Sequence, residues 1–203
     1  MWYVVEAEED AEIIFGVRDN TTKDMLKKAI KENTVENLLG KSKSKKGNAY
    51  FVEAGTIHAI GAGNLIAEIQ QNSDTTYRVY DYNRKDKDGN TRPLHIEKSI
   101  ACADLKASAE NYSDKKTEQI GTTKMTELAK CEYFTVEKIV CDGDAEFTVD
   151  NGCFRSLTVT DGNGTLTLNG ITTSVTRGEM VFIPAQTATV TLNGDFEAIL
   201  AYV

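Results

Sequence analysis

Three side chains that could act together on a small substrate lie at regular intervals in the first half of the chain. His58 lies in a glycine-bounded turn, EAGTIHAIGAGN, and Glu68 and Arg78 follow at intervals of ten residues. On strands joined by short turns, even spacings can return all three side chains to one face of a sheet. An imidazole that can bind a metal, a carboxylate and a guanidinium suit work on a phosphorylated, polyhydroxylated substrate. The structural alternative is a salt bridge between Glu68 and Arg78 inside a barrel.

The other histidine and the cysteines give weaker signals. His95 has no comparable neighbours, and we expect it to be a surface residue. No CxxC pair occurs among the cysteines, which lie far from both histidines, so neither a zinc ribbon nor a redox motif is predicted. We expect plain reduced thiols at Cys102, Cys131, Cys141 and Cys153.

The elements that must position these residues are strands and one helix. Runs of β-branched and aromatic residues separated by turn residues predict strands at 2–7, 12–17, 49–53, 64–70 and 76–82. Thr21 or Thr22 can cap a helix over 23–39, where apolar residues follow a helical period and Gly40 provides the stop. Glu68 and Arg78 are therefore predicted to lie on strands, with His58 in a turn.

The second half is predicted to form a separate unit made of strands alone. Short alternating segments such as GTLTLNG and TVTLNG recur from residue 131 to the end, with DG and NG pairs as predicted turns. This pattern is typical of a small sandwich or barrel. The mixed polar stretch over 101–130 is predicted to be a linker between units at 1–100 and 131–203. The second unit contains no histidine, so an imidazole-bound metal is excluded there.

Charge excludes some classes of partner. The chain has 31 acidic and 23 basic residues, a net charge of −8, which disfavours nucleic acid and anionic membranes. No apolar run is long enough to span a bilayer and no signal peptide is recognisable, so we expect a cytoplasmic protein. The basic run KSKSKK at 41–46 is predicted to be a solvated loop, with phosphate steering as the alternative.

The stretch from AGTIHAIGAGN to NTRPLHIEKSI closely resembles the bacterial type I mannose-6-phosphate isomerases. The signatures GTIHA, IQQNSDTTYRVYDY and DGNTRPLH carry the resemblance, which continues to the C-terminus. It implies a mainly β fold of two cupin-like barrels of jelly-roll type with a helical insertion near 23–39. It also implies a zinc-dependent aldose–ketose isomerase acting on a phosphorylated hexose. By this resemblance His58 is the last metal ligand, Arg78 the active-site arginine, Glu68 a candidate for moving the proton, and Arg84 a phosphate-binding residue.

The chain departs from this family at its front. In the family a glutamine, a histidine and a glutamate that precede the last histidine also bind the metal, and the glutamate directly precedes a segment like MWYVVEAEEDAEIIFG. Here that segment opens the chain, so we expect an N-terminally truncated isomerase with weak or absent zinc binding and very low activity. The alternatives are a non-catalytic cupin-like binding protein and a structural module. Exposed sheet edges make a homodimer possible.

Overall fold

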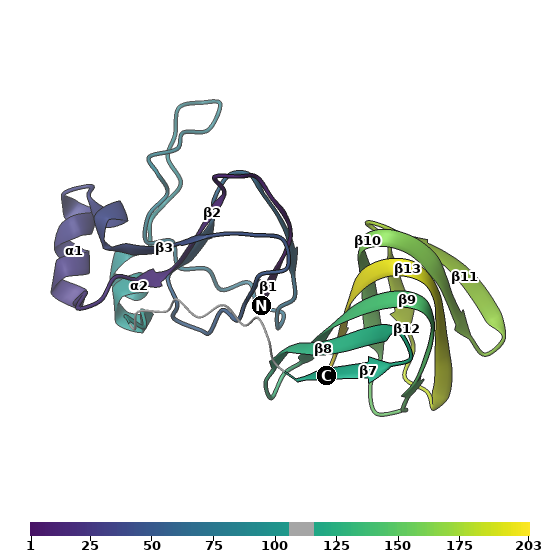
Figure 1. Ribbon diagram of the computed structural model, residues 1–203. Coiled ribbons are helices and arrows are strands. Elements are labelled where there is room, and N and C mark those ends of the chain that lie inside the picture. Colours follow the sequence, from purple (N-terminus) through teal and green to yellow (C-terminus); the bar gives the residue numbers. More distant parts are fainter. Residues whose placement is uncertain (106–115) are drawn as a thin grey trace. The chain divides into compact units, whose positions relative to one another are not determined.

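The computed structural model describes residues 1–105 and 116–203, which form two compact units (Figure 1). The amino-terminal unit takes in residues 2–67 and the described residues from 72 to 105. The carboxy-terminal unit takes in residues 116–203 together with Met1 and residues 68–71. The prediction of a mainly β fold with a helical insertion is confirmed. No helix in the described ranges is long and apolar enough to cross a membrane.

Two three-stranded sheets form the framework of the amino-terminal unit. One has the order β4-β1-β6, from Ala49–Tyr50, Trp2–Ala7 and Asn64–Glu68. The other has the order β3-β2-β5, from Leu39–Lys43, Glu12–Val17 and His58–Ile60. Apolar side chains from both sheets make a common buried cluster that contains Trp2, Val4, Ile13, Phe15 and Tyr50. Burial of this cluster holds the two sheets together.

The predicted helix begins where the sequence indicates but ends early. Helix α1 runs over Lys23–Lys31, and the hydroxyl of Thr22 accepts a hydrogen bond of 3.2 Å from the Met25 amide. Asn33 lies in the left-handed region, with a φ of 58°, and a 3-10 turn, η1, follows over Val35–Leu38. A left-handed residue cannot continue a right-handed helix, so the apolar period to residue 39 spans two elements. Helix α2, Ile96–Cys102, packs against both through Ile100.

Two local predictions in the amino-terminal half are wrong. The first half of the basic run lies in strand β3, where Lys41 and Lys43 form ion pairs of 3.4 and 3.6 Å with Glu12 and Asp10. The segment 76–82, predicted as a strand, has no regular structure, and its last residue, Tyr82, has a φ of 54°. Arg78 therefore lies on a loop rather than on a strand.

The carboxy-terminal unit is one strongly bent antiparallel sheet (Figure 1). Its strands follow the order β11-β10-β13-β9-β8-β7, and β12 pairs with part of β10. These strands are β7 Thr117–Ile120, β8 Thr123–Lys130, β9 Thr135–Val149, β10 Arg155–Leu168, β11 Ile171–Thr176, β12 Met180–Ile183 and β13 Ala188–Tyr202. Alternating apolar side chains of the long strands form the core of this unit.

Glycines that were predicted to mark turns instead bend continuous strands. Gly143 of β9 and Gly164 of β10 each lie directly opposite Gly194 of β13. A side chain at Gly194 would collide with the backbone of β10, because its Cβ would lie 2.6 Å from the Gly164 Cα. Gly164 and Gly194 therefore let β10 and β13 approach closely where the sheet curves.

The structure also differs from the predicted linker over 101–130. Residues 106–115 lie outside the described residues, but β7 and β8 occupy most of the remainder and extend the sheet of the carboxy-terminal unit. Ile120 and Thr123 pair across a two-residue turn that contains Gly121, with a φ of 61°. The polar composition of TEQI concealed this hairpin because β7 is the edge strand and most of its side chains are exposed, whereas β8 is mostly buried or half-buried despite the polar residues of TKMTELAK.

Candidate functional site

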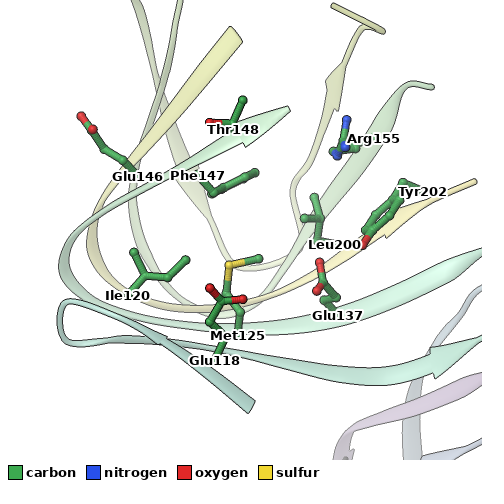
Figure 2. Close-up of a pocket in the computed structure, with 10 residues that line it drawn as sticks. All are labelled: Glu118, Ile120, Met125, Glu137, Glu146, Phe147, Thr148, Arg155, Leu200 and Tyr202. Carbon is green, nitrogen blue, oxygen red and sulfur yellow. The ribbon is translucent and has the colours of Figure 1, made fainter. Parts of the chain in front are cut away.

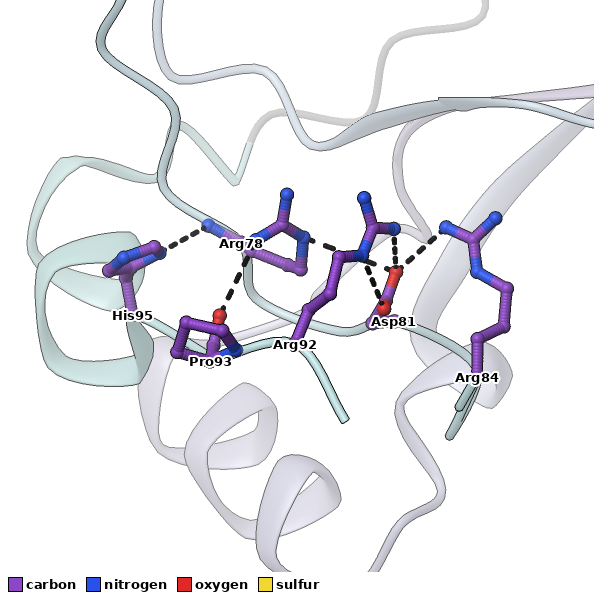
Figure 3. Close-up of polar contacts among 6 residues, drawn as sticks. All are labelled: Arg78, Asp81, Arg84, Arg92, Pro93 and His95. Atoms are coloured by element: carbon purple, nitrogen blue, oxygen red, sulfur yellow. Dashed lines mark hydrogen bonds and ion pairs between the residues drawn. The ribbon is translucent and has the colours of Figure 1, made fainter. Parts of the chain in front are cut away.

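Three arginines surround one buried carboxylate in the amino-terminal unit (Figure 3). The side chain of Asp81 is only 8% exposed. One of its oxygens, Oδ1, accepts a hydrogen bond of 2.7 Å from Nη2 of Arg84. Arg92 binds both oxygens, through Nη2 to Oδ1 and through Nε to Oδ2 at 2.8 Å. Arg78 completes the group, with its Nε 4.0 Å from Oδ1.

The arginine cluster, Arg78, Arg84 and Arg92 around Asp81, has an excess of positive charge. Hydrogen bonds from Arg92 and Arg84 hold the pKa of the Asp81 carboxyl well below its usual range, so this group stays ionised. Three positive charges then face one negative charge. The side chains of Arg84 and Arg92 are 64% and 50% exposed. A guanidinium has five N–H donors, so both present donors to solvent beyond those that Asp81 uses. Such a group suits a phosphate or another small anion.

Arg78 is held by pairing with His95. The His95 amide donates to the Arg78 carbonyl at 2.8 Å, and the Arg78 amide donates to Nδ1 of His95 at 3.2 Å. Because Nδ1 accepts this bond, the neutral His95 ring carries its proton on Nε2. Nη1 of Arg78 also donates to the Pro93 carbonyl at 3.4 Å. The half-buried His95 thus positions Arg78 and the start of α2, and the prediction of a plain surface residue is wrong.

A tight turn returns the chain from Arg84 to Arg92. The Asp86 carboxylate accepts hydrogen bonds of 2.9 Å from the amides of Asp88 and Asn90, which lower its pKa. Lys85 and Thr91 pair across this turn, and Gly89 supplies a positive φ of 84°. The turn brings two arginines that are separate in sequence to the same carboxylate.

His58 lies on β5 in a geometry that suits metal binding. Its Nδ1 lies 2.6 Å from the Thr56 carbonyl oxygen, and its ring meets the Trp2 ring edge to face, with centroids 5.2 Å apart. When Nδ1 donates a proton to a carbonyl, the lone pair of Nε2 is directed outward, as in metal-binding histidines. His58 is also exposed, so Nε2 is accessible.

The described residues do not complete a metal site around His58. Within residues 1–105 and 116–203, no three His, Cys, Asp or Glu side chains lie close enough together to hold an ion. A zinc site takes about three or four protein ligands. His58 is therefore a single candidate ligand, and the described part of the chain does not supply the other ligands of a zinc site.

The spacing of His58, Glu68 and Arg78 predicted side chains on one face of one sheet. The structure does not place them there. His58 lies on β5, Glu68 is the last residue of β6 in the other small sheet, and Arg78 lies on a loop. The exposed Glu68 also belongs to the carboxy-terminal unit, whereas the other two belong to the amino-terminal unit. Strand spacing failed because it assumed a regular strand over 76–82.

The spacing analysis overlooked Asp81, Arg92 and His95. A signal was available in the repeat R-x-x-D-x-x-R at 78–84, in which an acidic residue lies three positions from each of two arginines. The contribution of Arg92 depends on the turn over Lys85–Thr91 and could not be read from that repeat.

Comparison with known proteins finds one family of similar proteins. Residues 124–203 match the family model described as the mannose-6-phosphate isomerase cupin domain. The mannose-6-phosphate isomerase ManA of Bacillus subtilis (strain 168) is 36% identical over 201 residues, which are 99% of this chain and 63% of that protein. The chain is thus similar to the mannose-6-phosphate isomerases along nearly its whole length. It therefore spans less than two thirds of the length of this relative.

Solved structures of the isomerases agree with the fold described above. The crystal structure of the Bacillus subtilis mannose 6-phosphate isomerase matches with a TM-score of 0.90 and 36% identity, over 100% of this chain and 63% of that one. The Salmonella typhimurium enzyme bound to fructose 6-phosphate and zinc matches with a TM-score of 0.71 over 99% of this chain and 65% of that one. At 13% identity, the second match shows the fold alone.

Proposed function

We propose that this isomerase homologue acts in the interconversion of mannose 6-phosphate and fructose 6-phosphate, and that its arginine cluster binds the sugar phosphate. The observation that carries the proposal is the convergence of Arg78, Arg84 and Arg92 on the buried Asp81. Asp81 orients the guanidinium groups, so fewer side-chain rotations have to be frozen when an anion binds. Arg84 and Arg92 are the more exposed pair and are assigned to the phosphate.

Arg78 is assigned to the reacting end of the sugar. Its side chain is 24% exposed and donates to the Pro93 carbonyl, and its backbone amide donates to Nδ1 of His95. Aldose–ketose isomerisation moves a proton between C2 and C1 through an enediol, while negative charge develops on the neighbouring oxygens. A fixed guanidinium can stabilise that charge. Glu68 is the proposed proton carrier, and this role rests on the family resemblance.

Zinc is the cofactor that the family resemblance assigns to His58. When bound, a zinc ion would polarise the substrate oxygens. Because the described residues provide one ligand, we expect weak zinc binding and very low isomerase activity from the 203-residue chain alone. A cytoplasmic location and a homodimer formed through sheet edges complete the proposal.

Two measurements on one purified sample test this proposal. Titration calorimetry with mannose 6-phosphate measures binding, and a coupled isomerase assay with and without added zinc measures turnover. We expect saturable binding that weakens with ionic strength, because the contact is between charges. A chain that does not bind the sugar phosphate would contradict the proposal. Glu68→Gln should abolish any residual turnover and leave binding unchanged.

A non-catalytic sugar-phosphate-binding module is the second candidate function. The arginine cluster favours it, because three guanidinium groups can hold a phosphate without a metal. Saturable binding without turnover, at every zinc concentration tested, would select this function for the chain. Zinc-dependent turnover together with near-stoichiometric bound zinc would select the enzyme.

A further inference from the structure

The carboxy-terminal unit contains a cavity that the isomerase proposal does not use (Figure 2). Its volume is about 450 Å³, within the range of small-molecule sites. Strands β7, β8, β9, β10 and β13 line it, so the bent sheet itself forms the walls. All of its lining residues belong to the carboxy-terminal unit.

A buried arginine on the wall of this cavity has an unsatisfied donor group. The side chain of Arg155 is 9% exposed, and its Nη2 donates to Asp150 at 3.1 Å. Its other terminal nitrogen, Nη1, is buried and has no hydrogen-bond partner within the described residues. A buried donor without a partner is costly, so such a group calls for an acceptor from a ligand or a water molecule.

Arg155 is one of three polar side chains that meet in the cavity. Arg155 and Tyr202 lie opposite each other on β10 and β13, with the guanidinium carbon 5.0 Å from the centre of the Tyr202 ring. The Tyr202 hydroxyl lies close enough to the carboxylate of Glu137 on β9 for each group to affect the pKa of the other. Burial and this carboxylate raise the pKa of Tyr202 to about 12, so its hydroxyl stays protonated. The Glu137 carboxylate retains further lone pairs for a ligand.

Apolar side chains supply the rest of the wall, and acidic groups lie at the rim. Phe147, Leu200 and Met125 also line the cavity (Figure 2). Glu118 and Glu146 are exposed lining residues, so with Glu137 the cavity has three carboxylates and one arginine. This surplus of negative charge repels a phosphate.

We propose that this cavity is a binding site for an uncharged sugar or polyol. Neighbouring hydroxyls of such a ligand can donate to the Glu137 carboxylate, and a ring or hydroxyl oxygen can accept from the Arg155 guanidinium after a rotation that uncovers its buried Nη1. The apolar face of a sugar ring can pack against Phe147. The site is separate from the arginine cluster and its proposed phosphate, so either proposal can fail without the other.

Methyl NMR on the 203-residue chain tests the site, with methionine methyl groups labelled with ¹³C. Met125 lines the cavity, whereas Met25 and Met180 lie outside it and serve as internal references. We expect D-mannose to shift the Met125 signal saturably, with a Kd on the order of millimolar, and to leave the references unmoved. Mannose 6-phosphate should move the Met125 signal less at equal concentration.

Two variants make the test specific to the polar group. Glu137→Gln should weaken mannose binding about tenfold, through loss of a charge-assisted hydrogen bond. Tyr202→Phe keeps the ring over Arg155 and removes only the hydroxyl, and it should weaken binding by about threefold. The matched control is Tyr133→Phe, which makes the same change at an exposed tyrosine outside the cavity and should leave the Kd unchanged.

Three results would overturn the proposal. The first is an unmoved Met125 signal at saturating D-mannose. The second is a Met125 response that favours mannose 6-phosphate over mannose. The third is an unchanged Kd in both Glu137→Gln and Tyr202→Phe, with folding of each variant verified by the reference methyl signals.

Discussion

The arginine cluster of the amino-terminal unit and the cavity of the carboxy-terminal unit both contain an arginine–aspartate ion pair, but a different partner is buried in each. At the cluster, the carboxylate of Asp81 is buried and exposed arginines face outward. In the cavity, Arg155 is buried, its partner Asp150 is 66% exposed, and further carboxylates line the opening. Which partner is buried decides the sign of charge that a ligand meets. The first arrangement attracts a phosphate, and the second favours an uncharged, hydroxyl-rich molecule.

The two regions also differ in how their side chains are held. The cluster lies on a loop fixed by hydrogen bonds that the side chains of Asp81, Asp86 and His95 accept. The cavity residues Glu137, Arg155 and Tyr202 project from adjacent strands of one sheet. A single substitution can therefore disturb the loop site locally, whereas the cavity depends on the curvature of the entire sheet.

The largest expected effect comes from removing the exposed charges of the cluster. The double variant Arg84→Gln/Arg92→Gln should weaken mannose 6-phosphate binding more than about 100-fold, because each arginine loses a charge-assisted contact worth roughly 1.5–3 kcal/mol. Calorimetry measures this Kd. Arg18→Gln, at an exposed arginine outside the cluster, is the matched control and should bind normally. Binding by the double variant within threefold of wild type would assign the phosphate elsewhere.

A substitution at a glycine where two strands approach closely should destabilise the carboxy-terminal unit, which contains the cavity. Gly194→Ala places a methyl group against β10, at a φ of 139°, and should destabilise the carboxy-terminal unit by at least about 2 kcal/mol. Denaturant titration followed by the Met125 methyl signal measures the change. Gly170→Ala, also at positive φ but with open space around the new methyl group, should cost only about 1 kcal/mol. Equal losses in the two variants would refute the role given to close strand approach.

Removing the negative charges at the rim of the cavity should reduce its preference for an uncharged sugar over a sugar phosphate. Glu118→Gln/Glu146→Gln removes two exposed carboxylates, each worth about 0.2–1 kcal/mol against a nearby charge. The preference of the Met125 signal for mannose over mannose 6-phosphate should shrink by about threefold. Mannose binding itself should not change. An unaltered preference would mean that shape, rather than charge, excludes the phosphate.

The smallest expected effect is a difference in acid stability between the units. Bound arginines and amides lower the pKa values of Asp81 and Asp86, so their stabilisation is present above the ordinary aspartate pKa and is lost as pH falls through the lowered values. In the carboxy-terminal unit Asp150 behaves in the same way. Burial raises the pKa of Glu137, whose contribution is instead lost as pH rises through the raised value, so acidification partly offsets the loss from Asp150.

The amino-terminal unit should therefore unfold at a higher pH than the carboxy-terminal unit during acid titration. Fluorescence of Trp2, the single tryptophan, reports the first unit, and the Met125 methyl signal reports the second. Coincident acid transitions of the two probes would contradict this ordering.

Sequence patterns predicted the carboxy-terminal unit better than the amino-terminal one, for a physical reason. Half-buried antiparallel strands alternate apolar and polar residues, and segments such as Leu166–Leu168 and Val190–Leu192 follow that alternation. The DG and NG pairs were predicted to be turns, but several of them lie inside strands. A glycine gives the backbone the same φ freedom in a turn and in a bent strand. Which of these occurs depends on the neighbouring strands, and pairing of Gly143 with Gly194 is not visible in local sequence.

The candidate site was harder to predict because its geometry comes from a loop. Arg78 and Arg84 were found by resemblance, but spacing placed Arg78 on a strand that does not form. Asp81, Arg92 and His95 join the site only after the chain turns at Asp86–Asn90 and meets the start of α2. Similarly, Arg155, Glu137 and Tyr202 are brought together by sheet register and not by sequence distance.

One spectrum tests the central claim that the two regions divide ligands by charge. The ¹H–¹⁵N resonances of the arginine Nε groups report both regions of the 203-residue chain at once. We expect mannose 6-phosphate to shift the signals of Arg84 and Arg92 and to move the Arg155 signal less than D-mannose does at equal concentration, and D-mannose to shift Arg155 alone. If both sugars shift the same signals, or if mannose 6-phosphate acts first on Arg155, the division by charge is wrong.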